Sequence, residues 1–535
     1  MATSVEAGMK IMGTESKLKF GISALPTLNL LVNRRLQHFA YLVILLFCAV
    51  STLRLTIQEG VGLFSLYDGG YGDSYVYHTV ESYLQTGQIY PDLSNPFELP
   101  SLYGPLTYVL LSLPLRVISW ESGYLGLRLL ILASFLVCLY LVASISRKLI
   151  HHRRAVPVSL LLAASFGVLY GWPIQLRGDF PSILFALLAI RLLLSGRPWA
   201  PALAGAAAGF ALQFKFTYVA AAAAGFLWLT YHRKWKHLIA FSLTAALTSV
   251  GVYSLVLVRE PHMLAHIFAL RSPVLEYRGV AEFLYHLAKE PGLLLGLTMV
   301  PVLLLRRWPH WFLLALYFLI SFSVAVVTGI QAGSNINYFF ECLFAITPFA
   351  TLGVFWLRER TTNIGGVFLG LLIWGFGINP AVASTVATIG KARDAAVQNR
   401  YLQNLRGAFV GLNVFSTVPG VSHFAPKVFI AEPFLLSYLE RTGKRDSAPW
   451  AARIQRREFD LIVTRDQADS WRGIPHITPK IRAAIEESYQ PFCACPHILL
   501  FSRRQENLDS SLSLRFAAIG CRPVSCPGAT ECRVW

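Results

Sequence analysis

The sequence predicts an all-α polytopic membrane domain followed by a small α/β domain, and three observations lead to this fold class. Hydrophobic residues make up 55% of the 535 residues, and charged residues only 14%. Apolar runs of about 15 to 22 residues recur from about residue 38 to residue 382, which is the length that a helix needs to cross a bilayer. Beyond about residue 383 the hydropathy falls, and short strand-like and helix-like segments alternate.

The basic residues indicate membrane topology rather than nucleic-acid binding. The formal net charge is +18, but the Lys and Arg residues lie in short clusters between the apolar runs. The first 37 residues are polar and basic, and no small-residue cleavage site follows a short apolar core. We therefore expect a cytoplasmic N-terminal segment over 1–37, no removable signal peptide and no nucleic-acid partner.

The apolar runs predict about eleven membrane-spanning helices. One further run, 104–119, reaches only about 24 Å against a hydrocarbon core of about 30 Å. Pro114 also interrupts it. The expected spans are 38–57, 124–145, 155–173, 180–196, 200–214, 216–231, 238–258, 292–306, 309–329, 337–357 and 364–382.

Loop charge decides how the run 104–119 is placed. If it does not span, every basic loop falls on one face, which the positive-inside rule makes cytoplasmic. If it spans, every basic loop except the N-terminal one lies outside. We therefore expect 104–119 to be a juxtamembrane or re-entrant helix within one long outer loop, 58–123, and everything after about residue 383 to lie outside. The deciding residues are Lys17, Lys19, Arg34, Arg35, Arg147, Lys148, Arg153, Arg154, Arg197, Arg233, Lys234, Lys236, Arg306, Arg307, Arg358 and Arg360.

This topology places the polar residues that could take part in catalysis on the outer face. The spans themselves contain almost no Asp or Glu, and no internal repeat is evident, so an alternating-access transporter gains no support. Short Ala- and Gly-rich helices such as 200–214 favour close helix packing. The outer polar residues are Asp68 and Asp73 of the first loop, Arg177 and Asp179 of QLRGDFP, Lys215 between two short helices, Arg271 and Arg278 of a long loop, and the turn TGIQAGSNINYFFE.

Residues 383–504 predict a small, mostly parallel sheet with flanking helices. The segments AFVGLNVFS, PKVFIAE, FDLIVT and HILLFSRR read as strands, and PFLLSYLERTG, PWAARIQRRE and IRAAIEESY read as helices. The sequence has no phosphate-binding glycine loop and no nucleophile elbow here, so we expect a scaffolding, acceptor-guiding or partner-binding role. The tail, 505–535, is rich in Ser, Pro and Cys without periodicity, and we expect it to be loosely ordered.

Five of the eight cysteines crowd the C-terminal region. No histidine accompanies the last three, which argues against a metal site. If the region lies outside the cytoplasm, we expect disulfides with one thiol left over. The five are Cys493, Cys495, Cys521, Cys526 and Cys532, whereas Cys48, Cys138 and Cys342 fall in apolar helices and are expected to be inert.

Asp73 is the candidate general base. It follows Gly72 and precedes an amphipathic helical pattern that ends at Gly87, so we expect it near a helix N-terminus. One interpretation is a helix cap, for which Asp is well suited. The other is a carboxylate at the membrane surface that removes a proton from a hydroxyl group. The two roles are compatible, and Asp68 could act similarly or bind a cation.

Lys215 is the most informative cation, because an ammonium group between two nearly uncharged helices is costly without a partner. It either extends to the membrane interface or holds an anion. Arg271 and Arg278 are either solvated or bind the same anion, and Asp179 either holds a substrate or pairs with Arg177. The amide-rich turn either begins a helix or hydrogen-bonds a substrate through Ser334, Asn335, Asn337 and Tyr338.

Four stretches resemble the C-type integral-membrane glycosyltransferases, which include the protein O-mannosyltransferases and the aminoarabinose transferases. GDSYVYHTVESYLQTGQIYPD followed by LYGPLTYVLLSLP is similar to their first outer loop. QLRGDFPSILFALLA resembles the second outer loop, and GFALQFKFTYVAAA resembles a segment with a lysine after a small-residue helix. GSNINYFFECLFAITP resembles the Gly-Ser-Asn-x-Asn-Tyr element of bacterial relatives. The resemblance covers about residues 38–382.

The resemblance implies an enzyme that moves a sugar from a polyprenyl-phosphate donor to a glycan, lipid or protein acceptor outside the cytoplasm, in a bacterial inner membrane. Cations must then neutralise the departing phosphate. The implied roles are an inverting displacement with Asp73 as base, donor phosphate binding by Lys215, Arg177, Arg271 and Arg278, and substrate binding by Asp68, Asp179, Tyr103, Ser334, Asn335, Asn337 and Tyr338.

The sequence departs from the family pattern at Ser74, where the first loop would carry a second acid. If that acid matters, Asp68 or Glu81 has to replace it. No cofactor is certain from the sequence. The use of a divalent cation is left open, because some relatives use one and others do not. The rival functions are a transporter or flippase for a lipid-linked sugar, an oligosaccharide ligase or polymerase, and a membrane scaffold whose working part is the outer domain.

Overall fold

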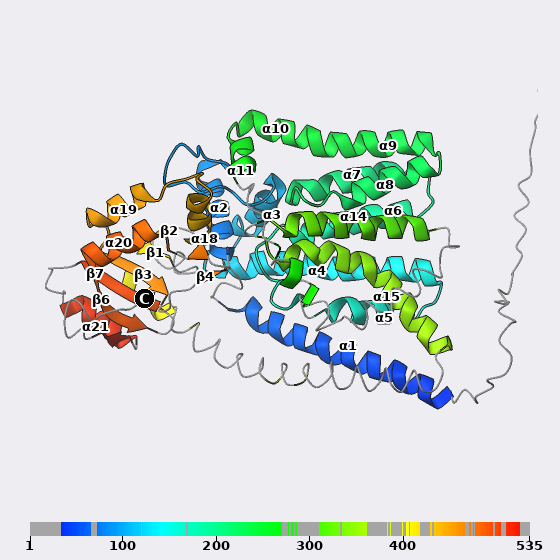
Figure 1. Ribbon diagram of the computed structural model, residues 1–535, viewed down its shortest axis with the longest axis horizontal. Coiled ribbons are helices and arrows are strands. Elements are labelled where there is room, and N and C mark those ends of the chain that lie inside the picture. The colour runs from blue at the N-terminus through cyan, green and yellow to red at the C-terminus, as the bar shows by residue number, and fades with distance from the viewer. Residues whose placement is uncertain are drawn as a thin grey trace, which may run out of the picture.

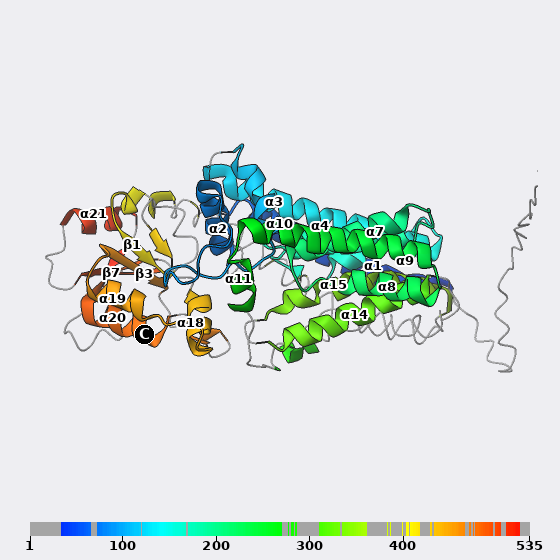
Figure 2. The same ribbon diagram turned by 90° about the horizontal axis from the view of Figure 1, so that it is seen from above.

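The computed structural model is a bundle of helices joined at one end to a smaller unit built around a β-sheet (Figure 1). Seen from above, α2 (Asp73–Thr86) and α11 (Met263–Ala269) lie between the bundle and the sheet unit (Figure 2). The structure describes residues 34–65, 72–118, 120–166, 169–269, 310–331, 334–360, 403–405, 407–417, 428–430, 433–465, 470–471, 474–475, 477–495, 498–503, 510–519 and 521–524, with isolated residues in 277–285 and 382–399.

The bundle helices follow the apolar runs of the sequence. Most of them run roughly along the long axis of the molecule (Figure 1). They are α1 (Arg34–Leu63), α4 (Trp120–Ile150), α5 (Ala155–Ala164), α6 (Asp179–Leu193), α7 (Ala200–Phe214), α8 (Ala220–Tyr231), α9 (Trp235–Ala246), the π-helix η2 (Leu247–Gly251), α10 (Val252–Arg259), α14 (Trp311–Gly329), the 3-10 helix η3 (Ile336–Phe339) and α15 (Phe340–Arg360).

The chain is an integral membrane protein, and five described segments are long and apolar enough to cross a bilayer. They are Leu42–Leu63, Tyr124–Ile150, Trp235–Arg259, Trp311–Gly329 and Ile336–Phe355. The expected number of eleven spans is not confirmed, and the spans 292–306 and 364–382 lie outside the described residues except for Val382. The expected helical span over 155–173 is wrong in its second half, because α5 ends at Ala164 and spans only ten residues.

Small residues let α7 pack closely against α9, as its Ala- and Gly-rich sequence predicts. A Cβ atom on Gly205 would lie 2.0 Å from the carbonyl oxygen of Phe241. A Cβ atom on Gly209 would lie 1.9 Å from Oγ1 of Thr248. Both distances are far inside van der Waals contact, so only glycine fits at these two positions.

Two helices of the first outer loop take the places that the sequence predicts. Helix α2 begins at Asp73 and ends with Gly87 in the left-handed region, at φ 76°, which glycine adopts without strain. Helix α3 (Pro105–Leu115) has only eleven residues and carries Pro114 near its end. Its length agrees with the expectation that 104–119 does not cross the bilayer.

Within the described residues, the main sheet of this unit has six strands in the order β2-β1-β3-β7-β6-β8. The strands β1 (Val414–Ser416), β2 (Val428–Ile430) and β3 (Leu461–Arg465) pair in parallel, whereas β7 (Ile498–Arg503), β6 (Tyr489–Cys495) and β8 (Arg522–Pro523) join in antiparallel order. The expectation of a mostly parallel sheet is therefore wrong. The cause is the direct connection from β6 to β7, since so short a turn joins antiparallel strands and not parallel ones. The helices of the unit are α18 (Pro433–Arg441), α19 (Ala448–Gln455), α20 (Pro479–Ser488) and α21 (Ser510–Ala518).

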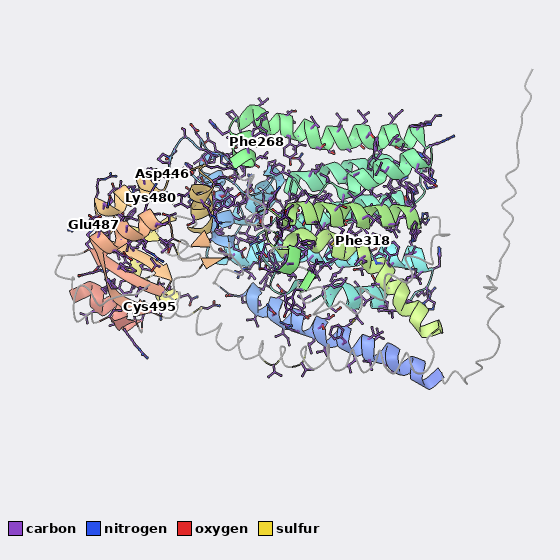
Figure 3. The ribbon with its side chains drawn as sticks, in the orientation of Figure 1. Phe268, Phe318, Asp446, Lys480, Glu487 and Cys495 are labelled. Atoms are coloured by element: carbon purple, nitrogen blue, oxygen red, sulfur yellow. A yellow bond between two sulfur atoms is a disulfide. The ribbon has the colours of Figure 1, made fainter. Side chains whose placement is uncertain are left out.

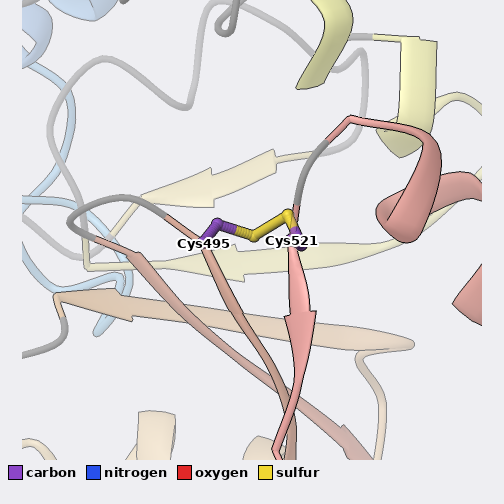
Figure 4. Close-up of a disulfide and its surroundings, with 2 residues drawn as sticks. All are labelled: Cys495 and Cys521. Carbon is purple, nitrogen blue, oxygen red and sulfur yellow. A yellow bond between two sulfur atoms is a disulfide. The ribbon is translucent and has the colours of Figure 1, made fainter.

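The sheet unit includes residues beyond 504, so the expected loosely ordered tail is wrong for the described residues 510–519 and 521–524. Phe516 of α21 packs into a hydrophobic cluster with Phe409, Phe492 and Leu500, and β8 pairs with β6. A disulfide joins Cys495 to Cys521 across these two strands (Figure 4). Cys493 is the buried thiol beside this bond. The expected disulfide is present, and the remaining two cysteines of the tail lie outside the described residues.

Candidate functional site

A tight backbone junction joins three segments that the sequence analysis expects on the outer face. The carbonyl oxygen of Phe214 accepts from the amide of Gly104 at 3.0 Å and from Oγ1 of Thr107 at 2.8 Å. A Cβ atom on Gly104 would lie 2.1 Å from the carbonyl oxygen of Gln213, and one on Gly178 would lie 2.6 Å from that of Phe214. These two glycines bring the first loop, the start of α6 and the end of α7 together.

Asp179 is the centre of a buried polar cluster at this junction. It is 1% exposed, and its Oδ1 lies 2.8 Å from Nζ of Lys215. The same oxygen accepts from the hydroxyl of Tyr218 at 2.8 Å, and Nδ2 of Asn337 lies 3.1 Å from both carboxylate oxygens. Asp179 therefore pairs with Lys215, a partner that neither of the two interpretations of Asp179 from the sequence had named.

Lys215 follows α7 in extended backbone. The side chain is 9% exposed, so it does not extend into solvent. Its Nζ lies 4.1 Å from the ring centroid of Tyr338, in the geometry of a cation–π contact. The expected cation is thus held by a carboxylate and an aromatic face, which offset its desolvation.

Asp73 lies on the other side of the junction and is completely buried. It is the first residue of α2, but Gly72 occupies the N-cap position and no side chain caps this helix. Oδ1 of Asp73 instead accepts from the backbone amide of Leu176, in the segment that precedes α6, at 3.1 Å. The side chain thus joins the first outer loop to the second, which a helix cap would not do.

Arg177 interacts electrostatically with both carboxylates. Its guanidinium is 4.7 Å from the ring centroid of Trp172. Burial lowers the pKa of Arg177, but Tyr103, Asp73 and Asp179 outweigh this effect and hold the pKa above its ordinary value. Burial raises the pKa of Tyr103 to about 12, so the phenol keeps its proton and can donate a hydrogen bond. The site therefore holds two carboxylates and two cations.

The polar side chains of the amide-rich turn make two kinds of contact: some bond to nearby backbone, and one reaches Asp179. The side chain of Asn335 accepts from the amide of Ile336, which fits the helix-capping interpretation, whereas Ser334 donates back to the carbonyl oxygen of Thr328 in α14. Asn337 points the other way, toward Asp179. It is 2% exposed, and its amide oxygen has no hydrogen-bond partner among the described residues.

The structure brings together most, but not all, of the residues expected at the site. Asp68, Arg271 and Arg278 lie outside the described residues. Sequence reasoning missed Tyr218 and Thr107, although Tyr218 follows Lys215 by three residues and Thr107 follows Gly104 by three. Within the described residues, the one group of three His, Cys, Asp or Glu side chains close enough to share a metal ion is the cysteine cluster of the sheet unit.

Comparison with known proteins identifies the fold. No family model and no curated protein matches the sequence. Among solved structures, ArnT from Cupriavidus metallidurans bound to undecaprenyl phosphate is similar, with a TM-score of 0.52 and 11% identity over 86% of this chain and 97% of that chain. The apo state of the same ArnT gives 0.51 and 12% over the same shares. The apo oligosaccharyltransferase of Archaeoglobus fulgidus reaches 0.44 and 11%, over 88% of this chain and 75% of that one, which is too low to support an argument.

These similarities give the chain the fold of the C-type glycosyltransferases, as the four matching stretches of sequence predict. The likeness extends over 97% of the length of ArnT. At 11 to 12% identity, it shows the fold alone.

Proposed function

We propose that this protein is a membrane glycosyltransferase that moves a sugar from a polyprenyl-phosphate donor to an acceptor on the extracytoplasmic side. One observation carries the proposal. A C-type fold places two buried carboxylates, Asp73 and Asp179, with the buried Lys215 and the half-buried Arg177 at the junction of its outer loops. Buried charges of this kind are costly, and their concentration at one end of a bundle marks a functional site.

The proposed reaction is a direct displacement at the anomeric carbon. Asp73 accepts the proton of the acceptor hydroxyl as the new C1–O bond forms, and the bond to the lipid phosphate breaks with inversion. Arg177 and Lys215 neutralise the phosphate oxygen that leaves, Arg177 by two parallel hydrogen bonds and Lys215 as a point charge. Arg271 and Arg278 of the following loop are proposed to contribute to the same phosphate.

Substrate binding is assigned to the groups around the two carboxylates. The unpartnered amide oxygen of Asn337 is proposed to accept from a sugar hydroxyl, since a buried acceptor without a partner is otherwise costly. Tyr103 is proposed to donate to the donor phosphate. The other proposed contacts are Asp68, Asp179, Ser334, Asn335 and Tyr338.

The lipid donor and the side of the membrane have separate support. The similar ArnT structure is bound to undecaprenyl phosphate. The disulfide between Cys495 and Cys521 favours an oxidising compartment for the sheet unit, in agreement with the positive-inside assignment. We infer a bacterial inner membrane with the site and the sheet unit facing outward, and a glycan, lipid or protein as acceptor.

The alternatives predict different products. A transporter or flippase would move a lipid-linked sugar without making a glycosidic bond, and a ligase or polymerase would transfer a preformed oligosaccharide. A scaffold would need neither carboxylate. We therefore propose to supply membranes that contain the protein with radiolabelled polyprenyl-phosphate sugars, together with membranes that lack it. Label that leaves the lipid and enters a new glycoside supports the enzyme, whereas label that changes sides on an intact lipid supports the transporter.

A further inference from the structure

The sheet unit holds the first outer loop through one arginine. Arg445 lies between α18 and α19, and its guanidinium donates to the backbone carbonyl oxygens of Leu93, Asn95 and Glu98. The bond to Leu93 measures 3.1 Å. The planar guanidinium carries five donors in fixed directions, so three carbonyls within six residues of chain fix the course of this segment.

Apolar and cationic contacts extend the same interface. The ring of Phe97 stands edge-on to Trp450 of α19 at 4.9 Å, and the guanidinium of Arg453 lies 5.0 Å from the Phe97 centroid. Nζ of Lys444 donates to the carbonyl oxygen of Ala269, at the end of α11, at 2.8 Å. Figure 3 labels Phe268 of α11 on the bundle and Asp446 on the facing part of the sheet unit. The loop therefore contacts the sheet unit, although Asp92, Ser94 and Asn95 stay exposed to solvent.

The held segment, 89–104, leads directly to the candidate site. The hydroxyl of Tyr75, two residues after the proposed base, donates to the carbonyl oxygen of Leu99 at 2.7 Å. The amide of Ser101 donates to Nδ1 of His266 at 2.8 Å, and the hydroxyl of Tyr90 donates to the carbonyl oxygen of Tyr103 at 2.9 Å. The segment ends at the backbone junction beside Lys215.

Glu260 binds the start of the same segment. The carboxylate of Glu260, just after α10, accepts from the amides of Ile89 at 2.8 Å and Tyr90 at 3.2 Å. The bundle therefore holds the two ends of segment 89–104, and the sheet unit holds its middle. A displacement of the middle would act on the rest of the segment through the hydrogen bonds that tie Leu99 to Tyr75 and Ser101 to His266.

We propose that the sheet unit is a positioning element for the site, with Arg445 as its principal positioning residue. Arg445 holds segment 89–104 so that Tyr103 stays beside Arg177, and so that α2 keeps the carboxylate of Asp73 against the second outer loop. This role rests on the proposed transferase function. It assigns the C-terminal unit a part in the reaction that needs no substrate contact of its own.

Three variants of the full-length protein test the role: Arg445→Ala, Arg445→Lys and the control Arg441→Ala, which removes an exposed arginine at the end of α18. Hydrogen exchange of segment 89–104 is measured first, without substrate. We expect exchange on the order of tenfold faster in Arg445→Ala, partial protection in Arg445→Lys, and wild-type protection in Arg441→Ala.

Steady-state transfer, expressed per folded molecule, gives the second readout. We expect kcat of Arg445→Ala to fall on the order of tenfold with the donor KM nearly unchanged, because displaced groups stabilise the transition state less while the lipid still binds. Arg445→Lys should recover part of kcat. A merely structural role would lower the yield of folded protein without changing kcat.

The outcomes separate this proposal from the transferase function. Faster exchange with an unchanged kcat in Arg445→Ala would overturn the positioning role, and so would wild-type exchange. A wild-type protein that transfers no sugar would overturn the transferase function, while hydrogen exchange would still report whether Arg445 holds the segment.

Discussion

Lys215 and Asp179 form a buried ion pair, with 2.8 Å between Nζ and Oδ1 and side chains that are 9% and 1% exposed. Lys215 is therefore not an unpaired cation. Its charge is neutralised by Asp179, so a phosphate that binds Lys215 must share the ammonium group with this carboxylate. This arrangement keeps the cation in place and charged in a largely apolar environment.

The ion pair makes a first prediction about Lys215→Met and Asp179→Asn. Each single variant leaves one charge buried without its partner, and we expect each to lower the free energy of unfolding by about 3–5 kcal/mol. The double variant should recover most of this loss, because it leaves neither charge. Thermal unfolding in detergent measures the effect, and additive losses in the double variant would contradict the pairing.

Transfer activity should not recover in the same way. The double variant restores folding but supplies no cation for the departing phosphate, so we expect its transfer to stay far below that of the wild type. If the double variant transferred sugar at the wild-type rate, Lys215 would have no role with the donor.

A second prediction concerns the backbone junction. The change Gly104→Ala would place a Cβ atom 2.1 Å from the carbonyl oxygen of Gln213, so the first loop must move away from α7. We expect a loss of about 1–3 kcal/mol in stability and a larger relative loss in kcat, because the site is built across this contact. Gly60→Ala is the matched control, since nothing lies within 4 Å of its added Cβ. Equal kcat values for the two variants would contradict the assignment of the site to this junction.

A third prediction concerns pH and His266, which lies outside the membrane spans. Burial is the main reason why the pKa of His266 is lowered to about 4, and His262 and Arg445 lower it further. In the folded protein Nδ1 accepts from Ser101, so the ring stays neutral. The unfolded chain binds a proton near pH 6.5, so stability is complete above that pH and is lost as the pH falls toward 4.

The stability of the wild type should therefore fall between about pH 6.5 and pH 4, by at most about 3 kcal/mol from this residue. Thermal unfolding at a series of pH values measures the slope. The variant His266→Gln cannot take up this proton and should show a flatter profile in that interval. An equally steep profile in His266→Gln would assign the slope to other groups.

A fourth prediction uses the disulfide of the sheet unit. Peptide mapping of protein isolated under non-reducing conditions should recover a Cys495–Cys521 crosslink, with Cys493 as a free thiol. The double variant Cys495→Ser/Cys521→Ser should lower the stability of the sheet unit by about 2–4 kcal/mol. Fully reduced cysteines in protein from growing cells would indicate a reducing compartment and contradict the outward placement.

The sequence predicted those parts of the fold that depend on local pattern. Asp73 at a helix start and Gly87 at its end follow from neighbouring residues, and the glycines of α7 indicate close packing directly. The pairing of Lys215 with Asp179 could not be read in this way, because the two residues are 36 positions apart and Arg177 was an equally good partner in sequence. Only the junction at Phe214 decides between them.

The sheet unit shows a second limit of sequence pattern. Strand and helix segments alternate in both parallel and antiparallel sheets, so the pattern could not reveal that β6, β7 and β8 run antiparallel. The tail gave no periodic signal, because α21 is short and Cys521 is fixed by a covalent bond rather than by an apolar stripe. The three contacts of Arg445 are made to backbone carbonyls, which no side-chain pattern records.

The most direct test of the central claim is transfer by purified protein and by its Asp73→Asn variant, reconstituted with a labelled polyprenyl-phosphate sugar and an acceptor that the wild type uses. The amide keeps the shape of the side chain and can still accept from Leu176, but it cannot take a proton from the acceptor hydroxyl. We predict a folded, membrane-inserted variant that transfers sugar at less than about a hundredth of the wild-type rate. Transfer by Asp73→Asn at a rate close to that of the wild type would contradict the account.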